Sequence, residues 1–171
     1  GLAGRPLPLL IRIGALVEHM RTRRQQVEGP QRPTTSDSPA WLPDFLATRS
    51  VESDWGLSRE FFHRKMTEAG GAMLLLDGLD EAPDRQARQD VVKLVENAAR
   101  DYDRCRFVVS SRPRAYQEQA PLPSFEEVTI APLDPGTVEQ SLRRWSQALY
   151  PESPESAEGH LAELLRALRE R

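Results

Sequence analysis

The sequence predicts an α/β domain built on a mostly parallel sheet. Apolar runs of strand length, at residues 7–13, 72–77 and 106–111, alternate with longer segments whose apolar residues recur at helical spacing. The runs are nearly continuous, which is typical of strands that helices cover on both faces. We therefore expect parallel strands with helices on either side of the sheet.

The first half of the chain is expected to contain one strand, one polar segment and two helices. Residues 7–13 form the strand. Residues 18–40 are polar and contain several prolines, serines and threonines, which predicts a surface loop or a disordered insertion. A short helix is expected at 41–46, and a second begins at Ser58, a favoured N-cap residue. The spacing on this second helix predicts four buried side chains: Phe61, Phe62, Met66 and Ala69.

The second half continues the alternation of strands and helices. Residues 84–100 place apolar side chains on one face and predict an amphipathic helix between the strands at 72–77 and 106–111. Residues 127–130 predict a fourth, shorter strand. Two C-terminal helices are expected, and Asp134 followed by Pro135 marks the start of the first one.

Composition excludes several classes of protein. The 171 residues include 23 Lys+Arg and 26 Asp+Glu, and the formal net charge of −3 argues against a nucleic-acid binder driven by bulk charge. The basic run at 21–24 lacks interleaved aromatic residues and is interpreted as a solvated surface. A single cysteine, Cys105, excludes an intramolecular disulfide framework. No apolar run reaches the roughly 18 residues of a membrane-spanning helix, so no membrane partner is expected.

Three acidic residues lie at the end of the strand predicted at 72–77. Asp77 ends the strand, Asp80 and Glu81 follow within one turn, and Gly78 removes side-chain bulk next to Asp77. Ligands of open parallel sheets bind at the carboxyl ends of the strands, and Mg²⁺ prefers oxygen ligands. Asp77 is therefore a candidate metal ligand, and Asp80 or Glu81 is a candidate base for an attacking water. An ordinary Asp–Gly turn before a helix is the alternative interpretation.

A second strand end carries groups that can bind a phosphate. Ser110 and Ser111 end the strand predicted at 106–111, and Arg112 follows them. If this strand lies near the one that ends at Asp77, the hydroxyls and the guanidinium can face a γ-phosphate. A solvated loop arginine held by Pro113 is the alternative. We favour phosphate recognition because a single helix separates the two strand ends.

These two segments resemble motifs of one protein family. Residues 74–83, Leu-Leu-Leu-Asp-Gly-Leu-Asp-Glu-Ala-Pro, resemble the extended Walker B motif of NACHT-domain proteins, which are signalling switches of the STAND class of P-loop NTPases. Residues 107–113 resemble the sensor 1 strand of the same family, and the likeness covers roughly residues 7–150. The resemblance implies a P-loop NTPase-type three-layer sandwich followed by C-terminal helices.

The resemblance also implies functional roles. It assigns Asp77 to Mg²⁺, Glu81 in preference to Asp80 to acid–base catalysis, and Arg112 with Ser110 and Ser111 to the nucleotide. ATP and Mg²⁺ are the implied cofactors. Slow hydrolysis would control a closed-to-open equilibrium and self-oligomerisation of a cytoplasmic, bacterial-type switch, with defence as one such role.

One departure from the family is large. No Gly-x-x-x-x-Gly-Lys-[Ser/Thr] sequence occurs, so the phosphate-cradling loop and its lysine are absent. We expect an N-terminally incomplete nucleotide-binding domain at 1–133 and the start of a helical subdomain at 134–171. The chain alone is then expected to bind ATP poorly or not at all. The alternative is a catalytically inactive interaction scaffold, and a conventional AAA+ motor fits less well because its acidic pair is adjacent.

Overall fold

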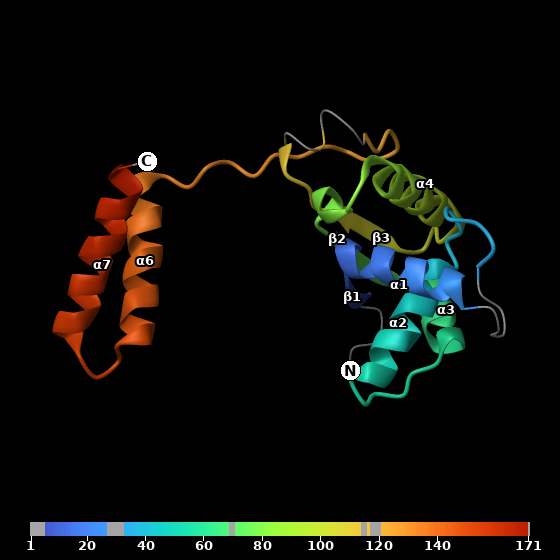
Figure 1. Cartoon of the computed structure of the whole chain (residues 1–171), viewed down its shortest axis with the longest axis horizontal. Coiled ribbons are helices and arrows are strands. Elements are labelled where there is room, and N and C mark those ends of the chain that lie inside the picture. The colour runs from blue at the N-terminus through green and yellow to red at the C-terminus, as the bar shows by residue number, and fades with distance from the viewer. Residues whose placement is uncertain (1–5, 27–32, 69–70, 114–115, 117–120, 171) are drawn as a thin grey trace. The chain divides into compact units, whose positions relative to one another are not determined.

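The computed structural model describes residues 6–26, 33–68, 71–113, 116 and 121–170. Two units are distinguished, Gly1–Glu127 and Val128–Arg171, whereas the sequence predicts a boundary at 133/134. Ala69, one of the side chains predicted to be buried, lies outside the described residues. The elements in chain order are β1 (Leu7–Arg12), α1 (Ile13–Gln25), α2 (Trp41–Glu52), α3 (Arg59–Thr67), β2 (Ala72–Asp77), the 3₁₀ turn η1 (Leu79–Glu81), α4 (Arg85–Asp101), β3 (Arg106–Val109), α6 (Pro135–Leu149) and α7 (Pro154–Arg169) (Figure 1).

The first unit is an α/β domain with a parallel sheet, as the sequence predicts. The strand order is β1-β2-β3, and both pairs are parallel. Ile11 lies opposite Leu76, and Leu76 lies opposite Val109. This row belongs to the face that packs into one core with α1 and α4. The three strands therefore end side by side at one edge of the sheet.

The opposite face of this sheet is partly open. Leu10 and Val108 flank Leu75 across the three strands, and their side chains are 60% and 48% exposed. The prediction that helices cover both faces is therefore wrong for the described part of the first unit, which has no second helical layer. Burial alternates along β1 and β2 although their apolar sequences are nearly continuous. An apolar run fits a strand buried on one face as well as a strand buried on two.

The helix predicted at 84–100 is confirmed by α4. The carboxylate of Asp84 accepts a hydrogen bond from the Ala87 N–H at 2.8 Å and caps the helix. The buried residues are those that the apolar stripe predicts: Ala87, Val91, Leu94, Val95 and Ala98. Ser58 likewise caps α3 through the Phe61 N–H, while Phe62 and Met66 are buried and Phe61 is partly buried.

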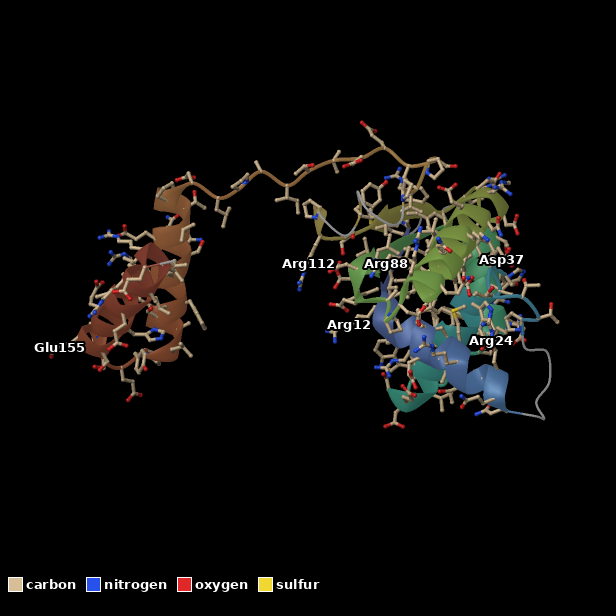
Figure 2. All side chains as sticks on the ribbon, turned by 45° about the horizontal axis from the view of Figure 1, so that its top comes forward. Arg12, Arg24, Asp37, Arg88, Arg112 and Glu155 are labelled. Atoms are coloured by element: carbon tan, nitrogen blue, oxygen red, sulfur yellow. The ribbon has the colours of Figure 1, made fainter. Side chains whose placement is uncertain are left out.

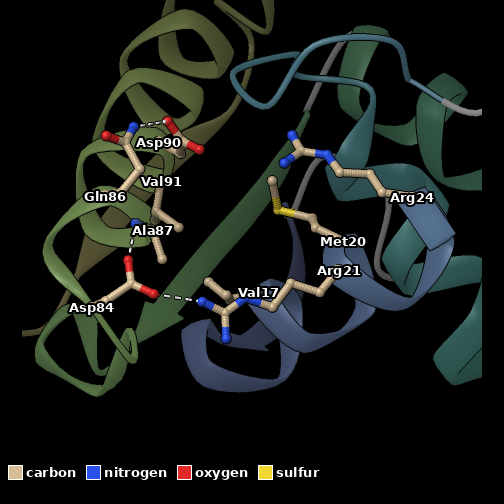
Figure 3. A pocket seen from close by; sticks show the side chains of 9 residues that line it. All are labelled: Val17, Met20, Arg21, Arg24, Asp84, Gln86, Ala87, Asp90 and Val91. Carbon is tan, nitrogen blue, oxygen red and sulfur yellow. Dashed lines mark hydrogen bonds and ion pairs between the residues drawn. The ribbon is translucent and has the colours of Figure 1, made fainter.

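The polar segment predicted at 18–40 is a helix over its first part. Helix α1 continues to Gln25 and buries Leu16, Val17 and Met20 against the core. The basic run at 21–24 therefore lies on this helix. Arg21 donates a hydrogen bond to Asp84 at 2.6 Å, beside a cavity of about 240 Å³ between α1 and α4 (Figure 3). The sequence pattern missed α1 because its buried stripe is narrow and most of its other side chains are charged.

Residues 127–130 form no strand, in contrast to the prediction. The side chains of Val128 and Ile130 are 81% and 93% exposed. Val, Thr and Ile favour extended backbone, but a strand also needs a partner edge and packing against one face. The sheet of the described residues consists of β1, β2 and β3.

The second unit is a pair of helices. Asp134 caps α6 through the Thr137 N–H at 3.0 Å, as the Asp–Pro pair predicts. Ser146 of α6 is buried and its hydroxyl shares a hydrogen bond of 3.0 Å with Nδ1 of His160 on α7. Across the described ranges of both units, no helix has the length and apolar character needed to cross a membrane.

Candidate functional site

The predicted site residues gather where the three strands end. Asp77 is the last residue of β2, and Ser110 directly follows β3. Arg12 ends β1 and is the register partner of Asp77. Figure 2 labels Arg12 and Arg112, which extend from this edge of the sheet. The carboxyl edge therefore carries a carboxylate, a hydroxyl and two guanidinium groups within three neighbouring chain segments.

Ser110 joins the ends of β2 and β3. Its hydroxyl donates to Oδ1 of Asp77 at 2.5 Å and accepts from the Gly78 N–H at 2.9 Å. Its backbone N–H donates to the Leu76 carbonyl, and its carbonyl accepts from the Leu79 N–H, both at 2.9 Å. The first bond orients the Asp77 carboxylate, and the other three join the backbone around Asp77 to Ser110. The exposed Asp77 carboxylate keeps acceptor capacity for a cation, because an ionised carboxylate offers about four lone-pair positions.

Gly78 is required by its backbone and by its neighbour. It adopts the left-handed conformation, with φ 78° and ψ 58°. A Cβ atom at this position would lie 2.8 Å from Cδ and 2.9 Å from Cγ of Glu81. The glycine therefore allows the chain to turn after Asp77 and gives the Glu81 side chain its space.

We expect Gly78→Ala to destabilise the first unit by about 1–2 kcal/mol, the cost of a left-handed conformation for a residue with a Cβ. The new methyl group would also displace the Glu81 carboxylate. Urea unfolding followed by circular dichroism measures the loss. Gly14→Ala is the matched control, because a Cβ at Gly14 has ordinary contacts of 3.8 Å. Equal effects of the two substitutions would contradict this account of Gly78.

Asp80 is held by Arg112. The Arg112 N–H donates to Oδ1 of Asp80 at 3.1 Å, and the Arg112 Nε lies 3.3 Å from Oδ2. The side chain of Asp80 is only 14% exposed, whereas that of Arg112 is 84% exposed. Nη2 of Arg88 donates to the Asp80 carbonyl at 3.4 Å. Asp80 thus positions the arginine, and the outer end of the guanidinium faces solvent.

Glu81 differs from Asp80 in its surroundings. The residue is exposed, and its carboxylate lies over the first turn of α1. Its Oε2 lies 3.8 Å from the point that a Cβ atom would occupy at Gly14. Within the described chain, no hydrogen bond or ion pair engages this carboxylate. Ser111 makes one weak contact near the site, from its hydroxyl to the Arg112 carbonyl at 3.4 Å.

The three acidic side chains do not converge on one point. No group of three His, Cys, Asp or Glu side chains among the described residues could hold a metal ion. Asp77 is bonded to Ser110, and Asp80 is bonded to Arg112. A divalent cation bound at this edge would therefore have Asp77 as its protein carboxylate, and water or a ligand would have to supply the remaining oxygens.

Arg12 is the residue at this edge that the motif search missed. It is the last residue of an apolar strand, as Asp77 is, and it is exposed. The criterion that identified Asp77, a charged residue at the carboxyl end of a buried strand, also identifies Arg12. The expected strand end at residue 13 concealed it, because the strand stops at Arg12 and α1 begins at Ile13.

Comparisons with known proteins add no assignment. A scan against protein-family models, a search of curated proteins and a search of solved structures each found no match.

Proposed function

We propose that this chain is the Walker B and sensor part of a NACHT-type nucleotide switch, which binds ATP with Mg²⁺ at the carboxyl edge of its sheet. The observation that carries the proposal is the Ser110–Asp77 hydrogen bond of 2.5 Å. This bond joins the end of β2, which carries Asp77, to the residue that follows β3, and the two strands are parallel neighbours. An acidic strand end and a phosphate-sensing strand end must be neighbours if they are to act on one γ-phosphate.

The contacts support separate roles for the six site residues. Asp77 would hold Mg²⁺, and the hydroxyl of Ser110 orients its carboxylate. Glu81 is the better candidate than Asp80 for the base that activates water, because Asp80 is already bonded to Arg112. Arg112, positioned by Asp80, would direct its outer nitrogens to a phosphate, with Ser111 beside it. Mg²⁺ would supply charge neutralisation on the phosphate oxygens.

The open edge of β3 supports the incomplete-domain interpretation. The N–H and C=O of Ser110 bond to the β2 side. Successive residues of a strand direct these groups to opposite edges, so those of Phe107 and Val109 point to the edge of β3 away from β2. No strand in the described part of the chain pairs with them. The NACHT resemblance implies a central P-loop strand, and the open edge of β3 could receive one, next to the strand that ends at Ser110.

Calorimetry with ATP and Mg²⁺ tests the nucleotide assignment. The chain alone is expected to show weak binding or none, because a P-loop lysine and its backbone amides supply most phosphate contacts. A chain extended to include a Gly-Lys-[Ser/Thr] loop should bind with Mg²⁺-dependent affinity. Tight Mg²⁺-dependent binding by the chain alone would show that the site is complete without that loop.

The second candidate is a catalytically inactive interaction scaffold. The missing Gly-Lys-[Ser/Thr] sequence favours it. The reading frame upstream of residue 1 discriminates between the two functions, because an encoded P-loop supports the ATPase and its absence supports the scaffold. Cytoplasmic location and nucleotide-controlled self-oligomerisation are part of the proposed nucleotide switch, and they are not proposed for the scaffold.

A further inference from the structure

A hollow of about 520 Å³ lies beside the outer side of β1, separate from the Asp77–Ser110 contact. This volume falls within the range of small-molecule sites. Its walls come from β1, the first turn of α1, α2, α3 and the loop between α2 and α3. Most of the lining side chains are apolar, and the larger ones are Leu10, Phe45, Leu46, Trp55 and Phe62.

The charge of this hollow is of one sign. Among the residues that the structure describes, its lining contains two charged residues, Arg12 and Arg49, and no acidic residue, although the whole chain has more acids than bases. Arg49 forms an ion pair with Glu52, but both side chains are more than half exposed, at 59% and 52%. Water screens such a pair, so Arg49 can turn to an anion at little cost. The hollow is therefore complementary to a negatively charged, apolar molecule.

Trp55 is held at this hollow by an ordered loop. Ser50 is 1% exposed; its carbonyl accepts from the Trp55 N–H at 2.9 Å, and its hydroxyl accepts from the Leu57 N–H at 2.8 Å. Asp54 and Gly56, on either side of the tryptophan, both have positive φ, 58° and 62°. A non-glycine residue in this region is uncommon. The loop thus keeps Trp55 71% exposed instead of letting it pack into the core.

We propose that this hollow is a binding site for a small organic anion with a flat apolar body. The carboxylate or phosphate of the ligand pairs with the guanidinium groups of Arg12 and Arg49, whose forked N–H donors match two oxygens of either anion. The apolar body lies against Leu46 and Phe62, and the exposed ring of Trp55 stacks on it. The site needs neither Mg²⁺ nor a P-loop, so it is independent of the function proposed above.

The test uses 2-naphthoate as the probe and the whole chain as the protein. Calorimetry should show saturable binding of 2-naphthoate and much weaker binding of the uncharged 2-naphthamide. Arg12→Gln and Arg49→Gln should each weaken the affinity by about tenfold, as expected for loss of one charge-assisted contact. Trp55→Ala should weaken the affinity for 2-naphthoate several-fold. A parallel titration with 1-naphthyl phosphate shows whether the site prefers a carboxylate or a phosphate.

Arg106→Gln is the matched control, because Arg106 is an exposed arginine at the opposite end of the sheet. It should leave the affinity unchanged. The proposal is overturned if neither anion binds, if 2-naphthamide binds as well as 2-naphthoate, or if Arg106→Gln weakens binding as much as Arg12→Gln.

Discussion

Substitution of Asp77 by alanine is expected to abolish Mg²⁺-dependent ATP hydrolysis in the protein that carries a P-loop together with this chain. Asp77 is, among the described residues, the carboxylate at the sheet edge that is both oriented by a neighbouring strand and exposed toward the solvent. Removing even a group that orients a metal ligand costs 10–100-fold in affinity or activity, so loss of the ligand should cost more than about a hundredfold. Steady-state release of phosphate over a range of Mg²⁺ concentrations measures the effect.

Two further variants make this prediction specific. Ser110→Ala removes the bond to Asp77 Oδ1 and should lower turnover by about 10–100-fold while saturating Mg²⁺ restores part of the rate. Asp103→Ala is the control, because Asp103 is an exposed aspartate before the start of β3, at the other end of that strand. Undiminished turnover in Asp77→Ala would remove the metal assignment and, with it, the proposed nucleotide function.

The position of the candidate site could be predicted from sequence, but its internal contacts could not. A charged residue after an apolar run marks a strand end, and this rule found Asp77 and the Ser110–Arg112 segment. The pairing of Asp80 with Arg112 depends on the distance between two strand ends, which residue order does not contain. Residue order also does not show that the Glu81 side chain fills the space where a Cβ of residue 78 would lie, which is one reason that this position needs glycine.

Elements were predicted where local pattern and tertiary packing agree. Helix α4 has a cap, an apolar stripe and a buried face in the same register, so each signal supports the others. Helix α1 buries few apolar residues, and a tertiary contact of His19 and Arg23 with α2 adds to its packing. Residues 127–130 show the opposite case, in which local preference for extended backbone finds no partner strand.

The contact between α1 and α2 is a buried charge cluster around Asp44. His19 Nε2 lies 2.8 Å from Oδ2 of Asp44, and Arg23 Nη2 lies 3.3 Å from Oδ1. The side chains of His19 and Asp44 are 9% and 7% exposed. The His19 ring also packs edge-on against Trp41 and Phe45, with ring centroids 6.1 and 5.5 Å away. Asp44 is therefore the polar partner of a His19 ring that lies against two aromatic side chains, and it also pairs with Arg23.

Asp44→Asn is expected to destabilise the first unit by about 2 kcal/mol at neutral pH, because it removes the charge of a buried carboxylate that is hydrogen-bonded to His19 and Arg23. Burial alone would raise the pKa of Asp44, but hydrogen bonds from His19 and Arg23 outweigh burial and lower it. A lowered carboxyl pKa stabilises the folded state above the ordinary value of 3.8, and this contribution is lost as pH falls through the folded-state pKa. Urea unfolding at several pH values should therefore show that the difference in unfolding free energy between wild type and Asp44→Asn narrows below about pH 4.

Glu52→Gln is the control, because it breaks the exposed pair with Arg49 on the same helix, and it should cost less than about 1 kcal/mol. A gap that stays constant down to pH 2 would show that the Asp44 carboxylate contributes by shape rather than by charge.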